Sequence, residues 1–441
     1  MIKNAIKVFS RIHPAKMILI GYLSHVLVGW LVLLLPICQN LGVSLLDNFF
    51  IAMSALSTTG LTTVDVGKEY SMIGQIVILL LIQAGGIGYM TFNTFIVLAT
   101  TRKLSLFRQM ITSTAFSLPR NFVISEFIFH VIIFTFVCEL IGAAVLSYLF
   151  MNNGIENFIW YGIFHSISAF CTAGFSLFPD SLMGFQDNLG INLVFSTLSI
   201  LGAIGFISWL DFYKKITGKK EYLTFTTKVI LFVTFWFLIL GSFLFLLTEN
   251  VFSEGSIYHK VITAFFQVMT ASTTVGFNTL DIGGLSVATI ILLIFLMVFG
   301  ASPSGTGGGL KSTTFVALVG LVKSTLKGQN HVSFWKREIP DKRLQLATAI
   351  FSYYILVMTI SVFFLVIVES KPLLPLVFEA ASALGTVGLS MGITSSLTEV
   401  GKILIALLMF MGKMGILTFG IALASKMKEE STFKIDNELI F

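Results

Sequence analysis

The stretch Thr273-Thr274-Val275-Gly276-Phe277 decides how this chain folds, because its pattern returns three more times along the sequence. Every copy has a threonine two places before a glycine and a large apolar residue directly after that glycine. The other copies are Ser57-Thr58-Thr59-Gly60-Leu61, Cys171-Thr172-Ala173-Gly174-Phe175 and Gly385-Thr386-Val387-Gly388-Leu389. A motif that recurs in this way predicts a repeated structural unit.

The flanks of the four motifs repeat as well. A long apolar run comes first, then a short segment that leads into the motif, then a second apolar run. The short segments cover residues 47–57, 158–171, 258–272 and 374–384. A helix of about 12 residues rises roughly 18 Å, little more than half of the hydrocarbon layer of a membrane. Each short segment is therefore predicted to be a re-entrant half-helix.

The composition requires lipid around much of the molecule. Of the 441 residues, 56% are hydrophobic and only 11% are charged, whereas soluble domains carry about 25% charged residues. The apolar runs at residues 16–36, 189–209, 229–247 and 344–368 are each long enough to cross a membrane as a helix.

These patterns together predict an all-α membrane protein of four parallel repeats. Each repeat consists of an outer helix, a pore half-helix, a filter loop and an inner helix, which gives eight transmembrane spans around a pseudo-fourfold pore. We place the repeats at residues 1–110, 111–222, 223–340 and 341–441.

Basic residues gather on one side of the predicted membrane. They cluster at residues 3–16, 102–120, 214–228, 323–343 and 426–434, whereas the short loops between them carry mostly acidic residues. The positive-inside rule places the basic segments, both termini and the C-terminal tail in the cytoplasm. We predict a multi-pass membrane protein. The cysteines show neither disulfide nor metal-site spacing.

The four motifs have the chemistry of an ion filter. Irregular backbone at membrane depth is tolerated where it lines a water-filled cavity or is buried in protein. Four such loops around one axis would form rings of carbonyl oxygens, which replace the hydration shell of an alkali cation. The half-helices would also direct the negative ends of their dipoles at that point. The predicted filter residues, which bind the cation through backbone carbonyls, are Ser57, Thr58, Thr59, Gly60, Cys171, Thr172, Ala173, Gly174, Thr273, Thr274, Val275, Gly276, Gly385, Thr386, Val387 and Gly388.

The inner helix of the third repeat is interrupted by a stretch that suits neither a continuous helix nor a strand. We expect a loop below the filter that obstructs the pore; the alternatives are a kinked helix and a surface turn. The predicted gating residues are Gly300, Ala301, Ser302, Pro303, Ser304, Gly305, Thr306, Gly307, Gly308, Gly309, Lys311 and Lys413.

Lys413 and Glu139 are ionisable residues inside apolar segments. Lys413 lies 13 residues, about 20 Å along a helix, from the basic end at Lys426, too far for its side chain to reach water there. We expect its ammonium group to project below the filter and to contact the gating loop; the alternative is an ion pair within the bundle. Glu139 is expected to pack against a polar neighbour.

The motifs resemble those of the Ktr/Trk/HKT superfamily of K⁺ transporters, and in particular the KtrB-type membrane subunits of bacterial Ktr systems. The resemblance covers essentially the whole chain. It is carried by the four filter segments and by residues 83–88, 300–311, 384–391 and 411–419.

The resemblance implies that this chain lies in the bacterial cell (plasma/inner) membrane and passes K⁺ in an uptake system, often stimulated by Na⁺, and is not an enzyme. It also implies a homodimer and a cytoplasmic KtrA-like ring of regulatory subunits that bind the nucleotide, with no cofactor on this chain. The segment beginning at Gly300 corresponds to the intramembrane gating loop of the family. Lys413 stands where the family generally has arginine.

The predicted filter departs from the signature of tetrameric K⁺ channels, because each copy has a single glycine. Its four walls are also unequal two places after that glycine, where the residues are Thr62, Ser176, Asn278 and Ser390. We therefore predict weak discrimination between K⁺ and Na⁺.

Two other classes of protein remain as alternatives. A secondary transporter of organic solutes would also have broken helices, but it would typically show inverted repeats. A membrane-embedded enzyme would need a metal or catalytic constellation, and the histidines have no metal-ligand spacing. Five of the six histidines, His13, His130, His165, His259 and His331, are scattered along the chain in this way.

Overall fold

A computed structural model describes residues 14–88, 124–249 and 256–424 of the chain. Four long outer helices begin the repeats: α2 (Pro14–Leu33), α8 (Ile124–Asn152), α12 (Phe225–Thr248) and α16 (Asp341–Val368). Each is long and apolar enough to span a membrane. Their exposed faces carry large apolar side chains such as Leu140 (74% exposed) and Phe363 (62%), as expected for surfaces that meet lipid.

The four half-helices are confirmed close to their predicted bounds. They are α3 (Leu45–Leu56), α9 (Phe158–Phe170), α13 (Ile257–Thr273) and α17 (Leu373–Gly385). The first and third begin at serines whose side chains accept a hydrogen bond from a backbone N–H in the first turn, Ser44 from Asp47 and Ser256 from Tyr258.

The inner helices depart from simple straight spans. The first is α5 (Met72–Ile87), and the third is α14 (Val287–Phe299), which continues after a loop as α15 (Ser312–Leu326). The second is bent by 92° between α10 (Leu189–Ala203) and α11 (Phe206–Ile216), and the fourth by 99° between α18 (Glu399–Met414) and α19 (Ile416–Ala424).

The run at residues 189–209 is therefore not one straight helix. Gly205 and Gly415 stand at the two breaks with φ values of +96° and +80°, which glycine adopts without a steric penalty. Within the described residues, the four outer helices and the two bent pairs have the length and composition of spans. The shorter helices α5 and α14 do not meet that length, so the count of eight spans stays a prediction.

The remaining described elements are short. They are η1 (Pro36–Cys38), α4 (Val66–Glu69), η2 (Met183–Phe185), η4 (Ile282–Gly284), η5 (Thr394–Ser396), and an antiparallel pair of strands, β1 (Ser333–Phe334) and β2 (Arg337–Glu338). Residues 3–13 of the predicted basic segment 3–16 lie outside the described residues, as do the predicted basic segments at 102–120 and 426–434 and the predicted boundary between repeats 1 and 2.

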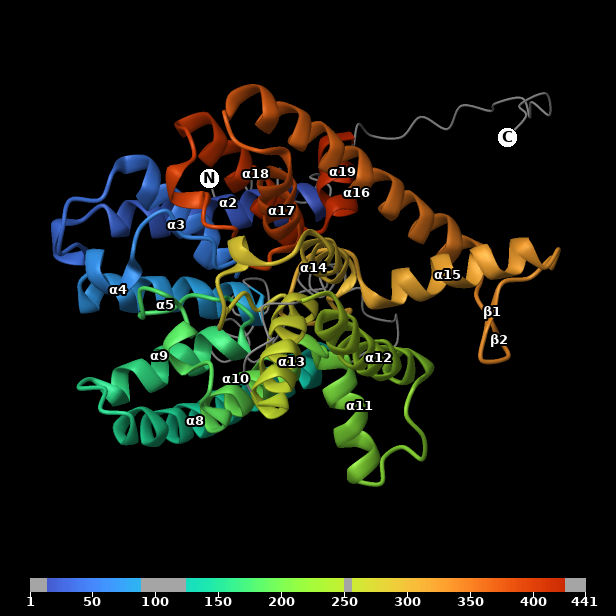
Figure 1. The fold of residues 1–441 in the computed structure, drawn as a ribbon. Helices are drawn as coiled ribbons and strands as arrows, with labels where there is room; N and C mark the ends of the chain where they lie inside the picture. The colour runs from blue at the N-terminus through green and yellow to red at the C-terminus, as the bar shows by residue number, and fades with distance from the viewer. Residues whose placement is uncertain (1–13, 89–123, 250–255, 425–441) are drawn as a thin grey trace, which may run out of the picture.

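The repeats close into a ring. Figure 1 shows them, from blue through green and yellow to red, as groups of helices around the middle of the molecule. The inner helix of each repeat packs against the half-helix of the next: α5 on α9, α10 on α13, α14 on α17 and finally α18 on α3. The last of these contacts joins the fourth repeat to the first, so all four half-helices end near a common centre.

Candidate functional site

Each half-helix ends in the same hydrogen-bonded turn. In the first repeat, the N–H of Thr58 donates to the carbonyl of Ala55 (3.1 Å), and the N–H of Thr59 donates to that of Ser54 (2.9 Å). The same pair of bonds recurs in the other three repeats. This pair defines a Schellman motif, in which the left-handed position is usually glycine.

A threonine occupies the left-handed position in every copy. The φ values are 49° at Thr58, 49° at Thr172, 58° at Thr274 and 50° at Thr386. A left-handed conformation costs a β-branched residue about 1–2 kcal/mol. Strain of this kind persists where the surrounding structure enforces it, and it concentrates at functional sites. Its fourfold recurrence marks the ends of the half-helices as the candidate site.

The four motif glycines form a closed ring. All four have positive φ, from +67° to +95°. A β-carbon on Gly60 would collide with the backbone carbonyl oxygen of Ala173, in the next repeat. The pattern continues around the ring: Gly174 abuts the carbonyl of Val275, Gly276 that of Val387, and Gly388 that of Thr59. The structure thus brings the predicted filter segments of all four repeats together around one axis.

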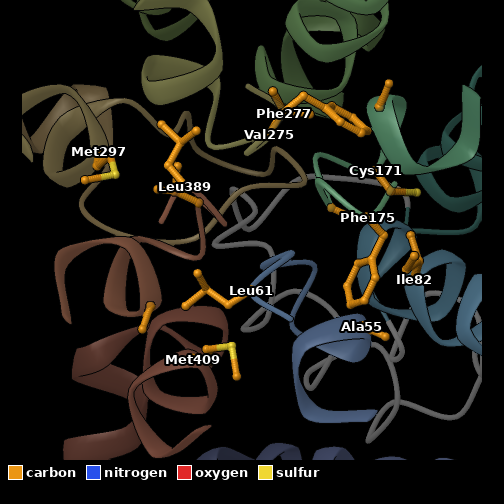
Figure 2. Close-up of a cluster of buried hydrophobic side chains, with 14 of the residues drawn as sticks. Ala55, Leu61, Ile82, Cys171, Phe175, Val275, Phe277, Met297, Leu389 and Met409 are labelled. Carbon is orange, nitrogen blue, oxygen red and sulfur yellow. The ribbon is translucent and has the colours of Figure 1, made fainter. Parts of the chain in front are cut away.

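An apolar collar supports this ring from behind. The large residue after each motif glycine is at most 1% exposed. Figure 2 shows these side chains, one from each repeat, arranged around the ring together with Met297 and Met409 of the inner helices. They are Leu61, Phe175, Phe277 and Leu389.

In three repeats, a polar side chain nine places before the motif glycine hydrogen-bonds the segment that follows this glycine and so acts as a brace for it. The imidazole of His165 hydrogen-bonds Ser176 (3.1 Å), the amide of Gln267 hydrogen-bonds Thr279 (3.0 Å), and Glu379 accepts hydrogen bonds from Ser390 and Thr394. The first repeat has Ile51 there.

This brace was missed by sequence reasoning, which treated His165 as one of several scattered histidines. The signal that could have found it is the constant spacing from the glycine, because the residue types differ. A hydroxyl residue six places before the glycine was also missed, although it is present in every copy: Ser54, Ser168, Thr270 and Ser382.

A cavity of about 430 Å³ lies on one side of the ring. All four motif glycines line it, as do the residues two places after them, and its wall includes the carboxylates of Asp65, Asp180 and Asp281. A concave site lined by one sign of charge raises the local concentration of the opposite ion. This cavity therefore suits the collection of cations at the mouth of the ring.

The loop between α14 and α15 lies on the other side of the ring and contacts the strained threonines. Thr306 Oγ1 is 2.8 Å from Thr172 Oγ1, and the N–H of Gly308 donates to Thr386 Oγ1 (2.8 Å). A β-carbon on Gly307 would collide with Thr274 Oγ1. Ala301, Ser302 and Thr306 are at most 2% exposed, so the surface-turn alternative is wrong.

Lys413 links this loop to the strained threonine of the first repeat, Thr58. Its ammonium group donates to Thr58 Oγ1 and to the carbonyl of Thr306, both at 2.5 Å. Among the ion pairs of the described residues, none involves Lys413. Lys413 thus contacts the loop on the side of the ring opposite the acidic cavity, and its role in gating stays a prediction. Lys311 donates to the carbonyl of Gly307 at 2.8 Å and so closes the loop on itself.

The same loop fills the break in the second inner helix. The N–H of Phe206 donates to the carbonyl of Ser304 (3.2 Å), and the N–H of Thr306 donates to that of Gly202 (3.3 Å). The backbone groups freed by the bend are thus satisfied by the loop, as burial requires. A cavity of about 330 Å³ lies beside it, lined by the loop and by residues 412–418.

Glu139 packs against polar neighbours, as expected. Its carboxylate accepts hydrogen bonds from Gln83 Nε2 (3.0 Å) and from Cys171 Sγ (3.5 Å). It is 4% exposed and lies behind the second motif.

Comparisons with known proteins agree with this arrangement. A family model described as TrkH, cation transport protein, matches residues 33–435. Ktr system potassium uptake protein B of Bacillus subtilis (strain 168) is 34% identical over 447 residues, covering 100% of this chain and 99% of the relative. Potassium/sodium uptake protein NtpJ of Enterococcus hirae is 33% identical, covering 98% of both.

A solved structure shares the fold. The crystal structure of the potassium transporter TrkH from Vibrio parahaemolyticus matches with a TM-score of 0.67 at 21% identity. The match covers 87% of this chain and 79% of the other.

Proposed function

This chain belongs to the TrkH family of cation transport proteins, and on that premise we propose that it is the ion-translocating subunit of a bacterial K⁺ uptake system. The family consists of transporters and not enzymes, in agreement with the sequence analysis. The relatives named as potassium or potassium/sodium uptake proteins support K⁺ as the substrate and Na⁺ as a second permeant or activating ion.

K⁺ passes through the ring of backbone carbonyls at the ends of the half-helices. The single observation that carries this proposal is the closure of the ring, with each motif glycine abutting a carbonyl of the next repeat. A cation that sheds its hydration water needs oxygen ligands from all sides, and four equivalent backbone turns supply them. The acidic outer cavity supports this proposal, because its carboxylates raise the concentration of cations at the mouth of the ring.

The gate is the loop at residues 300–309, with Lys311 and Lys413. The loop contacts the threonines of all four repeats. In this proposal it obstructs the path below the ring. A fixed ammonium group at that level opposes a cation, so the loop and Lys413 together hold the pathway closed. In this proposal the chain forms a homodimer that binds a cytoplasmic KtrA-like nucleotide-binding ring, and this ring moves the loop. Both termini are placed on the cytoplasmic side.

The test is K⁺ uptake by bacteria that lack their own K⁺ uptake systems. The full chain is expressed alone and with Ktr-type regulatory subunits, next to Gly276→Ser and to the control Gly184→Ser. Gly276 has positive φ and abuts a neighbouring carbonyl, whereas a β-carbon on Gly184 meets open space.

We expect uptake that Gly276→Ser weakens and that Gly184→Ser leaves intact. If well-expressed parent chain supports no uptake even with the regulatory subunits, the proposal fails, and transport of an organic solute becomes the better interpretation. Equal K⁺ uptake by the two variants would show that the ring is not part of the ion pathway.

A further inference from the structure

The hairpin between α15 and α16 contains a strained turn. Its strands pair Phe334 with Arg337, so Trp335 and Lys336 form a two-residue loop. Both have positive φ, 49° and 60°. Two-residue hairpins with this backbone favour Asn-Gly, because most other residues adopt it only with strain. Backbone strain persists only where surrounding contacts offset it, and it concentrates at functional sites. The strained turn therefore points to a function of the Trp335 and Lys336 side chains.

Aromatic contacts fix the hairpin against the outer helix α12. The ring of Trp335 lies 4.9 Å from that of Phe232 and 4.8 Å from that of Phe334. The guanidinium of Arg337 lies 5.3 Å over the ring of Phe225. Trp335 nevertheless stays 48% exposed. The hairpin therefore presents an indole ring and a guanidinium group on the first two turns of α12.

The base of the hairpin is rigid. Val332 packs in a small core with Ala317 of α15 and Leu344 of α16. Figure 1 shows the hairpin at the far end of α15, at the edge of the molecule. The side chains at its tip are thus held in place before any ligand arrives.

The contacts place the tip at the boundary between lipid and water. The 24 residues of α12 span about 36 Å, slightly more than a hydrocarbon core of about 30 Å. Phe225 begins this helix and follows a basic segment, so its first turns lie at the side that the positive-inside rule assigns to the cytoplasm. Tryptophan concentrates at this depth because its ring is amphipathic.

Three cationic side chains surround the aromatic surface. Lys336 and Arg337 are exposed on the hairpin, and Lys228 is exposed on α12 between Phe225 and Phe232. Among the ion pairs of the described residues, none involves these three cations; the neighbouring Glu338 pairs with His331 (3.1 Å). The cluster thus offers positive charge without an internal anion.

We propose that this hairpin site, formed by Phe225, Lys228, Phe232, Trp335, Lys336 and Arg337, binds the headgroup of an anionic phospholipid. Arginine and lysine would hold the phosphate, arginine through two parallel hydrogen bonds. The acyl chains would lie along the exposed phenylalanines of α12, and the indole ring would sit at the glycerol level. The apolar half of the site at lipid depth favours a lipid over a soluble anionic partner.

The test measures lipid retention by the purified full-length chain, so it does not depend on transport. Native mass spectrometry compares phosphatidylglycerol with phosphatidylcholine of the same acyl chains. One variant combines Trp335→Asn with Lys336→Gly, which suits the turn backbone and so preserves folding. A second combines Lys336→Gln with Arg337→Gln, and its control combines Lys68→Gln with Lys260→Gln, two lysines far from the hairpin.

We expect the parent chain to retain phosphatidylglycerol at least about fivefold better than phosphatidylcholine. Both hairpin variants should lose most of that preference with an unchanged melting temperature, and the control should keep it. A parent chain without the preference, or hairpin variants that keep it, would overturn the proposal. So would variants that bind lipid normally but lose a soluble cytoplasmic partner, because the hairpin would then be a protein interface.

Discussion

The ring and the layer directly below it differ in symmetry. At the ring, all four repeats share the same turn, with a left-handed threonine and a positive-φ glycine. Below it, the first, second and fourth inner helices end or bend at Gly88, Gly205 and Gly415, whereas the third carries a loop. A cation needs oxygen ligands from every side, which favours four equal turns. A single axis has room for one obstruction, so only one repeat can supply it.

The largest effect is expected where the ring closes. Gly388 and Gly392 both have positive φ, +95° and +81°, so alanine strains both backbones alike. A β-carbon on Gly388 would also collide with the carbonyl of Thr59, whereas on Gly392 it meets open space. We expect Gly388→Ala to lower initial K⁺ uptake at least about tenfold, and Gly392→Ala to lower it less than about threefold. Similar losses in both would mean that strain alone matters.

The second comparison separates two threonines with the same backbone but different partners. Thr386 Oγ1 accepts the N–H of Gly308, whereas Thr274 Oγ1 has no hydrogen-bond partner in the described structure. Glycine relieves the left-handed strain at either position, by about 1 kcal/mol. At Thr386 it also leaves a buried N–H unpaired, at about 1–3 kcal/mol.

Thr386→Gly should therefore unfold at a lower temperature in detergent than Thr274→Gly, which should unfold at or slightly above the temperature of the parent chain. The reverse order of melting temperatures would show that the hydroxyl of Thr386 does not hold the loop.

The sequence was sufficient for the repeated, symmetric part of the molecule. The second half-helix, predicted at residues 158–171, is observed as Phe158–Phe170. Its short length and its motif are local properties, so the prediction needed no tertiary information. The placement of Lys413 below the ring also followed from its depth in an apolar segment.

The bends and the braces could not be predicted in the same way. A glycine such as Gly202 in an apolar helix is common, and what it does depends on its neighbour, here the carbonyl of Phe170 at the end of a half-helix. Likewise, His165 and Glu379 share a spacing from the motif glycine but no chemistry, so their residue types alone could not mark them as equivalents.

The asymmetric layer should respond to loss of the cation that tethers the loop to the ring, Lys413. Lys413→Met removes the ammonium group from Thr58 Oγ1 and from the carbonyl of Thr306, so the loop loses a tether and the path loses a positive charge. We expect K⁺ flux into proteoliposomes to rise about fivefold, and Lys413→Arg to stay near the parent value, since the charge remains. A lower K⁺ flux in Lys413→Met would instead show that Lys413 stabilises the ring and does not hold the pathway closed.

The smallest effect concerns the one charge that breaks the symmetry of the ring itself. Nine places before the glycine, the third repeat has Gln267 and the fourth has Glu379, each bonded to the loop behind the outer cavity. A carboxylate there favours a cation at the ring, because both lie in a region that excludes bulk water. Glu379→Gln keeps an oxygen acceptor for Thr394 but removes the charge. We expect the K⁺ concentration for half-maximal uptake to rise about threefold, with little change in the maximal rate.

The exchanged variant, Glu379→Gln with Gln267→Glu, moves the charge to the neighbouring repeat. If the charge acts through the common axis, this variant should recover part of the lost affinity, because the repeats are equivalent at the ring. If it acts only by holding Ser390 and Thr394 in place, the exchange should recover nothing. The K⁺ concentration dependence of uptake in the same cells distinguishes these two mechanisms. It tests whether a charge has the same effect on the cation from either repeat, as the symmetry of the backbone suggests.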